Sequence, residues 1–378
     1  MAERVLITGG AGFIGTRIAR HLLAAGFTVR ILDVLLPQVH GEEPHLSDWL
    51  ERDCELIVGD VRDRSVVETA VGDVDVVIHL AAETGTAQSM YAIERCVSVN
   101  AGGTATLLEC LVPHARRVRK LVVASSRAVY GEGKYVCSLC GPVYPPSRRA
   151  EDLVAGRWDP LCPRCGAAVT VAATDEDSRM SPASIYGATK VSQELFACAF
   201  GPAFDLPVVI LRYQNVYGAG QSLANPYTGI LTHFFSALRR GDAPRVFEDG
   251  QESRDFVHVD DVVQASALAV AAQAGGVFNV GSGVSTSIFA LARAMCRSMG
   301  AQIEPVIVPE YRVGDIRHCV ADLSRATTTL GYVPAVKLEK GLSEFVVWAA
   351  EQPPSGGSVT QANRELAALG LLRSAHAG

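Results

Sequence analysis

Three glycines near the start of the chain limit its possible folds more than any other feature. Gly9, Gly12 and Gly15 recur at every third position, between an apolar run that begins at Val5 and a helical pattern at residues 14–25. Such a glycine-rich connection lets a buried strand turn tightly into a helix that packs closely against it. The chain therefore begins with a strand–loop–helix unit.

The first half of the chain continues this alternation of strand and helix. Short β-branched runs are separated by helical patterns at residues 65–71 and 101–114. Continuous apolar strands that alternate with helices indicate a parallel sheet covered by helices on both faces. The expected strands occupy residues 5–10, 28–34, 54–60, 74–82 and 120–126. We predict an α/β fold with a doubly wound parallel sheet of the Rossmann type.

Composition and charge exclude several classes of protein. The chain has 378 residues, which suggests two or three domains. A net charge of −6 disfavours a nucleic-acid-binding protein that depends on positive charge, and charged residues or histidine interrupt every long apolar stretch. The apolar run at Val5 leaves no room for a signal peptide before it. We expect a cytoplasmic protein that binds neither nucleic acid nor a membrane.

The glycine loop and Asp33 together predict a dinucleotide site. In a strand–loop–helix unit of this kind, the loop amides and the positive end of the helix dipole face a pyrophosphate. Asp33 ends the second expected strand. A carboxylate at that position accepts hydrogen bonds from the adenosine ribose and repels a 2′-phosphate, which favours NAD over NADP. A turn cluster with a capping aspartate is the simpler alternative, but the surrounding pattern favours the cofactor.

Tyr186 and Lys190 form the candidate catalytic pair. Their four-residue spacing places both side chains on one face of a helix expected at residues 184–200. An ammonium group beside a phenol stabilises the phenolate and lowers its pKa, so Tyr186 could act as a general base toward a sugar hydroxyl. The same spacing also occurs by chance in surface pairs, so the assignment depends on the other motifs.

Taken in order, the motifs resemble the extended short-chain dehydrogenase/reductase family, and within it the NAD-dependent nucleotide-sugar epimerases and dehydratases. The resemblance runs from the glycine loop to about Trp348. Beyond the glycine loop and the Tyr186/Lys190 pair, it is carried by residues 79–82, 125–131, 211–218, 254–261, 279–281 and 312–315. It implies an NAD-dependent enzyme whose substrate is a nucleotide-diphosphate sugar, and a homodimer paired through the helices that follow residues 101 and 184.

The resemblance also implies a division of the chain. An NAD-binding Rossmann domain would occupy residues 1–212, interrupted by an insert at residues 132–170. A smaller nucleotide-sugar-binding domain would occupy residues 213–350, with a segment near 255–280 returning to the first domain. Residues 351–378 would be a linker and a C-terminal helix.

Position by position, the resemblance assigns roles to site residues. Ser126 would bind the reacting sugar oxygen, Tyr186 would be the base, and Lys190 would also hold the nicotinamide ribose. Tightly bound NAD would contact Gly9, Gly12, Phe13, Ile14, Gly15, Asp33, Asp60, Val61, Leu80, Ala81, Ala82, Asn100, Tyr186 and Lys190. The nucleotide sugar would contact Thr84, Ser126, Arg127, Asn215, Asn225, Arg254, Arg312 and Asp315. A surface ion pair with Asp255 is the alternative for Arg254.

Arg127 and Ala128 separate two reactions of the family. Its 4,6-dehydratases carry an Asp-Glu pair at these positions, and Ala128 cannot transfer a proton. The resemblance therefore favours a 4-epimerase that acts through a transient 4-keto sugar, with dTDP-L-rhamnose and dTDP-6-deoxy-L-talose as the best expected pair. The alternatives are a 4-epimerase of UDP-glucose, UDP-galactose or a UDP-uronic acid, a 4,6-dehydratase or oxidoreductase, and a non-catalytic NAD-sensing protein.

Four of the ten cysteines occur in two Cys-x-x-Cys-Gly motifs within the insert. Cys137 and Cys140 form the first motif, and Cys162 and Cys165 the second. This spacing is close to that of structural zinc sites with four thiolate ligands, which leave no position open for substrate. Free thiols or disulfides are the alternatives, and a cytoplasmic location disfavours disulfides. We predict a zinc-ribbon-like insert beside the entrance to the sugar site.

Overall fold

A seven-stranded sheet dominates the computed structural model, which describes residues 2–41, 46–223, 225, 229–273, 275–353 and 359–375. The strand order is β13-β9-β5-β4-β1-β2-β3, and every neighbouring pair is parallel. These strands are β1 (Arg4–Thr8), β2 (Thr28–Asp33), β3 (Glu55–Val58), β4 (Val76–His79), β5 (Lys120–Ser126), β9 (Val208–Tyr213) and β13 (Gly276–Val280). The predicted α/β class and Rossmann-type parallel sheet are confirmed.

Helices cover both faces of this sheet because successive strand residues point to opposite sides. In β1, Ile7 faces a core shared with α1 and α11, whereas Leu6 faces a core shared with α4, α7 and α9. These helices are α1 (Phe13–Ala24), α4 (Arg64–Val71), α7 (Gly103–Leu111), α9 (Ile185–Ala203) and α11 (Val259–Ala271). Both faces are therefore apolar, as the continuous hydrophobic runs predicted.

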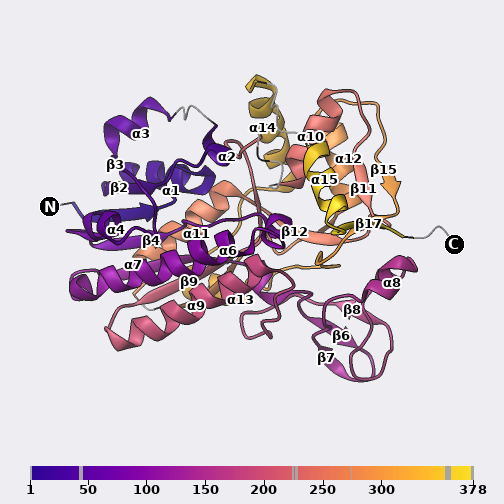
Figure 1. Ribbon diagram of the computed structural model, residues 1–378, viewed down its shortest axis with the longest axis horizontal. Helices are drawn as coiled ribbons and strands as arrows, with labels where there is room; N and C mark the ends of the chain where they lie inside the picture. Colours follow the sequence, from indigo (N-terminus) through magenta and orange to yellow (C-terminus); the bar gives the residue numbers. More distant parts are fainter. Residues whose placement is uncertain are drawn as a thin grey trace.

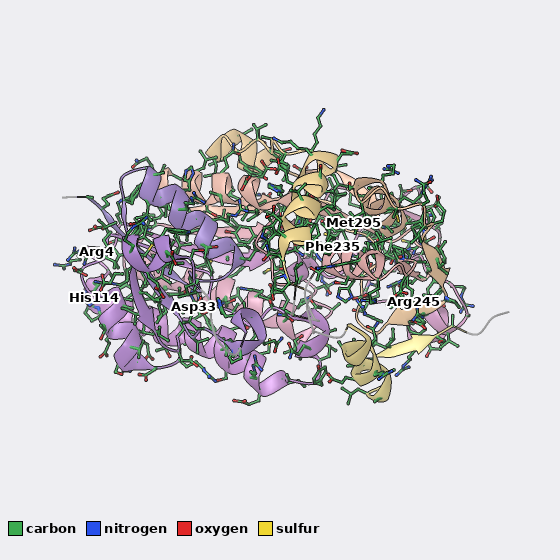
Figure 2. All side chains as sticks on the ribbon, turned by 90° about the horizontal axis from the view of Figure 1, so that it is seen from above. Arg4, Asp33, His114, Phe235, Arg245 and Met295 are labelled. Carbon is green, nitrogen blue, oxygen red and sulfur yellow. The ribbon has the colours of Figure 1, made fainter. Side chains whose placement is uncertain are left out.

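A second, smaller lobe comes from the C-terminal half of the chain. It contains β10 (Asn215–Tyr217), β11 (Arg245–Phe247), β12 (Ser253–His258), β14 (Ser285–Ser287), β15 (Val306–Val308), α10 (Ile230–Arg239), α12 (Ile288–Ser298) and α14 (Leu338–Glu351). Phe235 and Met295 lie in its apolar core, well away from Asp33 in the sheet half (Figure 2). The chain returns from this lobe to the large sheet, because α11 packs on α1 and β13 pairs with β9.

The cysteine insert forms a small unit of its own. Its antiparallel sheet has the order β7-β6-β8 and consists of β6 (Tyr135–Cys137), β7 (Gly141–Val143) and β8 (Val169–Val171), with α8 (Ala150–Val154) beside it. Tyr135, Cys137, Val143 and Cys162 make a separate apolar cluster. Figure 1 shows this unit at the lower right, apart from the large sheet and below the second lobe.

The C-terminal segment folds back onto the second lobe. α15 (Val359–Ala368) precedes β17 (Leu372–Ser374), which pairs antiparallel with β16 (Glu310–Arg312). Most of the expected linker, residues 354–358, lies outside the described residues. The remaining short elements are α2 (Pro37–His40), α3 (Asp48–Asp53), α5 (Thr86–Ser89), α6 (Ile93–Val97), the π-helix η1 (Ser98–Gly102), the 3-10 helices η2 (Val112–His114) and η3 (Arg127–Tyr130), and α13 (Ser324–Leu330). Among the described helices, none is both long and apolar enough to cross a membrane.

Candidate active site

A cavity of about 750 Å³ runs along the carboxyl ends of the central strands of the large sheet. It lies where the strand order reverses direction around β1 and β4, the usual position of a ligand crevice in such sheets. Of the predicted site residues, the cavity is lined by Gly9, Gly12, Phe13, Ile14, Gly15, Asp33, Asp60, Val61, Leu80, Ala81, Ala82, Thr84, Tyr186, Lys190 and Asn225. The fold thus brings together residues that lie more than two hundred positions apart in the sequence.

The glycine loop shows two different reasons for a glycine. A Cβ atom on Gly15 would come within 2.6 Å of main-chain atoms of Gly9 and Gly10, closer than real side chains allow. A Cβ atom on Gly12 would approach only the carbonyl oxygen of Gly9, at 3.3 Å. Gly15 is therefore required by the packing of α1 against the loop, whereas Gly12 leaves space on the cavity side.

Asp33 holds the glycine loop in place from the end of β2. Its Oδ2 accepts the main-chain N–H of Ala11 at 3.0 Å, and its Oδ1 accepts that of Leu35 at 2.9 Å. A carboxylate oxygen can accept more than one hydrogen bond, so both oxygens can still bind a ribose hydroxyl. The sequence predicted a ligand role for Asp33, and the structure adds a role in shaping the loop.

The start of α9 places Tyr186 at the cavity. The Ser184 side chain caps the helix by accepting the N–H of Gly187 at 3.1 Å. A Cβ atom on Gly187 would lie 2.6 Å from the carbonyl oxygen of Ala128, so only glycine lets α9 approach η3 this closely. This close approach sets the Tyr186 phenol beside the Ser126 hydroxyl, which helps to stabilise the phenolate.

Lys190 is buried one helical turn after Tyr186. Its Nζ donates to the carbonyl oxygen of Ala124 at 2.8 Å and lies 5.9 Å from the centre of the Tyr186 ring. Burial lowers the pKa of Lys190 to about 8, because a desolvated ammonium group is disfavoured. An ammonium group that has lost part of its hydration is thus held at the base of the cavity.

The predicted lowering of the Tyr186 pKa is not what the structure shows. Burial raises the pKa of the phenol, and the Ser126 hydroxyl and the Arg127 charge only oppose that rise. The reason is that the ring is desolvated, while the Lys190 ammonium lies toward its face and donates to Ala124. The spacing of Tyr186 and Lys190 predicts that the two residues are neighbours, but it does not report the balance between desolvation and charge.

A buried polar network fixes the two elements that carry the catalytic pair. Arg212 of β9 donates to the Glu194 carboxylate on α9 at 2.7 Å and to the Tyr130 hydroxyl at 2.9 Å. The Ser125 hydroxyl donates to the same glutamate, and the Tyr130 hydroxyl donates to Asn279 on β13 at 2.8 Å. These contacts tie β5, β9, β13, η3 and α9 together, so Ser126 and Tyr186 have fixed relative positions.

Asn100, predicted to contact the cofactor, does not line the cavity. It is fully buried, and its amide donates to the carbonyl oxygen of Glu83 at 3.0 Å and to the Thr189 hydroxyl at 2.9 Å. Its side-chain oxygen accepts the N–H of Glu83 at 2.8 Å. We correct its role to that of a positioning residue, which joins the loop after β4 to α9.

Arg254 makes main-chain contacts and does not form the ion pair with Asp255 that was the alternative to a substrate contact. Its guanidinium is buried and donates to the carbonyl oxygens of Ile316 at 2.7 Å and Arg317 at 3.1 Å, so it supports a loop. Asp255 is not its ion-pair partner, since that buried carboxylate accepts the N–H groups of Ser282 and Gly283. In this arrangement Arg254 holds the loop that contains Ile316 and Arg317.

That loop carries Arg312 and Asp315 beside a small depression next to the cavity, whose wall also includes Leu366 and Leu371 of the C-terminal segment. The Arg312 guanidinium stacks over the Phe247 ring, 5.0 Å from its centre. Arg312 Nε and Asn215 Oδ1 are buried without a hydrogen-bond partner among the described residues. Unpaired buried polar atoms are costly, so these two are candidates for contact with a polar ligand.

Arg127 follows Ser126 at the start of η3. Burial lowers its pKa, with a further contribution from the Arg254 charge, while Asp315 and Tyr186 act in the opposite direction. The cation therefore lies between Tyr186 and the loop of Arg312 and Asp315. A substrate-facing role is consistent with this position.

Several cavity residues have no motif that would have revealed them. Glu83 and Arg95 form an ion pair of 2.6 Å on the wall of the cavity, and Arg62 pairs with Asp60 at 2.6 Å. Arg62 also holds the pKa of the Asp60 carboxyl below its usual range through its hydrogen bonds. Arg62 and Glu83 lie on irregular loops after β3 and β4, and Arg95 lies on the short helix α6, so sequence periodicity carries no signal for them.

Comparison with known proteins gives consistent matches. Residues 5–148 and 165–281 match the NAD dependent epimerase/dehydratase family, with a gap that falls inside the cysteine insert. The chain is 40% identical over 93% of its length, and 96% of the relative's, to the dTDP-L-rhamnose 4-epimerase of Burkholderia thailandensis. The structure resembles the UDP-glucose 4-epimerase of Thermotoga maritima with UDP-glucose, with a TM-score of 0.75, 29% identity, and coverage of 92% and 99% of the two chains. It also resembles the NAD complex of the Thermus thermophilus UDP-glucose 4-epimerase, with a TM-score of 0.72, 27% identity, and coverage of 93% and 100%.

Proposed function

The chain belongs to the NAD dependent epimerase/dehydratase family, and from that premise we propose that it is a nucleotide-sugar 4-epimerase that interconverts dTDP-L-rhamnose and dTDP-6-deoxy-L-talose. One observation carries the choice of sugar, namely the 40% identity to the Burkholderia thailandensis enzyme over nearly the whole of both chains. UDP-hexoses are the second candidate, because the structural relatives include UDP-sugar epimerases.

The cavity fits NAD by the chemistry of its lining. The open face of the loop at Gly12 and the N-terminus of α1 suit a diphosphate, and the Asp33 carboxylate suits the hydroxyls of an adenosine ribose. Lys190, at the inner end, would hold the nicotinamide ribose. When bound, NAD supplies the acceptor and the donor of the hydride that leaves and returns at C4 of the sugar.

The protein's own residues move the proton and hold the sugar. The Tyr186 phenolate oxygen takes the proton of the C4 hydroxyl, and the Ser126 hydroxyl binds the same sugar oxygen. The Ser126 hydroxyl and the Arg127 charge oppose the effect of burial on the pKa of Tyr186, while Lys190 donates to the carbonyl oxygen of Ala124 beside it. Tyr186 returns the proton after the 4-keto sugar has turned in the pocket, so the configuration at C4 inverts without net oxidation.

Dehydration would require a second acid at the position after Arg127. Ala128 is there, and it is buried in η3 with no group that transfers a proton. This absence supports epimerisation over 4,6-dehydration within the same family.

The test is to incubate the purified enzyme with dTDP-, UDP- and GDP-sugars and to identify the products by NMR. We expect a C4 epimer from dTDP-L-rhamnose and no accumulation of NADH. Accumulated NADH would indicate an oxidoreductase, and a 4-keto-6-deoxy product would indicate a dehydratase. Either result would overturn the proposal.

The four insert cysteines are proposed to hold a structural zinc ion. All four are free thiols, and their sulfur atoms lie within 4.8 Å of one another, with Cys137 and Cys165 at 3.6 Å. Tetrahedral zinc with Zn–S bonds of about 2.3 Å places its sulfurs about 3.8 Å apart, which agrees with this cluster. Metal analysis of the purified protein should give one zinc per chain, and a metal-free folded protein would contradict the assignment.

A cytoplasmic homodimer is proposed as the working form. Leu195 and Phe196 on α9 and Ile93 on α6 are exposed large hydrophobic residues on two adjacent helices. Such apolar surface is a common mark of a protein interface. Light scattering on the eluting protein should give twice the mass of 40.1 kDa, and a monomer at micromolar concentration would contradict it.

A further inference from the structure

The cysteine insert contacts the second lobe at the loop of residues 311–318, which we call the substrate loop because it carries Arg312 and Asp315, and at Glu248 in the turn after β11. Trp158 of the insert packs against Tyr311 at the start of this loop, with ring centres 6.0 Å apart. Tyr135 of the insert lies against His318 at its end, with ring centres 6.4 Å apart. The two ends of the substrate loop therefore rest on the insert.

Arg148 of the insert makes the central contact. Its guanidinium binds both oxygens of Glu248, each at 2.8 Å, and also donates to the carbonyl oxygen of Asp315 at 2.9 Å. Both side chains of this ion pair are almost fully buried. A guanidinium can form such a set because its donors are fixed in one plane, and it thereby fixes the main chain at Asp315.

Arg317 of the substrate loop makes a second set of contacts with the insert and with the turn after β11. It binds both oxygens of Asp249 at 2.7 and 2.8 Å and donates to Asp159 of the insert at 2.7 Å. Its main-chain N–H donates to Glu132, at the start of the insert, at 2.8 Å. The loop is thus bonded to the start and the middle of the insert as well as to the turn after β11.

This geometry is specific to the substrate side. Arg148, Trp158 and Asp159 do not line the NAD cavity. A buried charged network of this kind selects one conformation of the loop more than it adds to the free energy of unfolding. The network has no other evident task than to fix where Arg312 and Asp315 lie.

We propose that the insert is a support for the substrate loop, and that Arg148 is a positioning residue for the nucleoside diphosphate of the substrate. The inference rests on the proposed function, because it assumes that Arg312 and Asp315 bind that group. In this proposal the insert affects the affinity for the substrate, and it affects neither NAD binding nor the chemical step.

The experiment measures the binding of dTDP and UDP to the NAD-loaded enzyme by calorimetry, in the wild type and in Arg148→Lys. Lysine keeps the charge but cannot bind Glu248 with two donors and Asp315 at once. We expect the dissociation constant for dTDP to rise roughly tenfold or more, while NAD content is unchanged. The KM for the sugar should rise with it, and kcat should change little. The matched control is Arg149→Ala, because Arg149 is an exposed neighbour whose partner is Asp152.

A second variant protects the test against a folding defect. Asp159 is exposed, so Asp159→Asn removes the negative charge that binds Arg317, and weakens this contact, without leaving a buried charge on the insert. We expect a smaller rise in the dTDP dissociation constant, of a few fold. Unchanged dTDP binding in folded Arg148→Lys and Asp159→Asn would overturn the inference, as would a parallel loss of NAD.

The two proposals fail differently. A wild type that binds dTDP but epimerises no sugar would refute the proposed function, and the dTDP measurements would still decide the role of Arg148. A wild type that binds neither diphosphate would overturn the inference itself. Epimerisation with normal kinetics in both variants would leave the function standing and remove the role of the insert.

Discussion

The two halves of the active-site cleft are built in opposite ways. On the cofactor side, one short segment supplies the glycine loop, and the Asp33 carboxylate fixes it by binding main-chain N–H groups. On the substrate side, Arg312 and Asp315 depend on contacts from the insert, from the strand β12 and from the C-terminal segment. Main-chain geometry sets the first half, whereas ion pairs between distant segments set the second.

This difference indicates where the sequence can change without loss of the proposed hydride and proton transfer. The cofactor side tolerates little change, because Gly15 and Gly187 sit where any Cβ atom would strike main-chain atoms. The substrate side is assembled from loops and an insert that the family match skips in part. Substrate preference can therefore be altered there while the NAD site and the catalytic pair stay intact.

The largest expected effect comes from removing the hydroxyl that transfers the proton, a change that leaves both halves of the cleft intact. Tyr186→Phe removes the hydroxyl that transfers the proton and retains the ring. Turnover should fall by roughly 10²–10⁴-fold, with NAD content and dTDP affinity unchanged. Tyr144→Phe, in the insert, is the matched control. Wild-type turnover in Tyr186→Phe would exclude it as the base.

A pair of glycine variants tests the cofactor half. Gly15→Ala forces a Cβ atom against main-chain atoms at 2.6 Å, so it should lower the free energy of unfolding by about 1–3 kcal/mol even without NAD. Gly12→Ala has only a 3.3 Å contact, so stability without NAD should stay within about 0.5 kcal/mol while NAD affinity falls. Thermal unfolding and NAD titration separate these outcomes. Equal stability losses in the two variants would contradict the distinction.

The same contrast explains how much the sequence could predict. The parallel sheet, the glycine loop, Asp33 and the Tyr186/Lys190 pair follow from local patterns, and the structure gathers them at one cavity. The motif position of Asn100 predicts a cofactor contact, but its side chain is buried in hydrogen bonds and does not line the cavity. The Arg148–Glu248 pair joins positions one hundred residues apart. No spacing rule reports such a contact, because the fold alone creates it.

Removal of the proposed zinc ion tests whether the cysteine insert supports the substrate half of the cleft. If zinc holds the insert together, a chelator or Cys165→Ser should loosen the position of Trp158 and Arg148 and raise the KM for the sugar a few fold. NAD content and kcat should be unchanged, since the insert does not line the NAD cavity. Cys198→Ser, an exposed cysteine on α9, is the control. A loss of NAD on chelation would contradict the separation of the two halves.

The smallest effect concerns a buried charge on the cofactor side. Lys190 has no carboxylate within salt-bridge distance among the described residues, unlike Arg148, and burial lowers its pKa to about 8. Between about pH 8 and its unfolded pKa of 10.5, the unfolded state binds more protons, so wild-type stability should rise with pH in this window. The shift corresponds to roughly 3 kcal/mol of destabilisation below pH 8.

Lys190→Met removes that charge, so it should unfold at a temperature a few degrees higher than the wild type at pH 7, although it loses activity. The loss of a donor to Ala124 offsets part of the gain. We therefore expect the stability advantage of Lys190→Met over the wild type to shrink as pH rises from 8 toward 10. Lys340→Met, at an exposed position, should show no such trend. A difference in unfolding temperature between Lys190→Met and the wild type that does not change with pH would mean that burial does not destabilise the charged form of Lys190. The charges on the two sides of the cleft would then be stabilised to a similar degree.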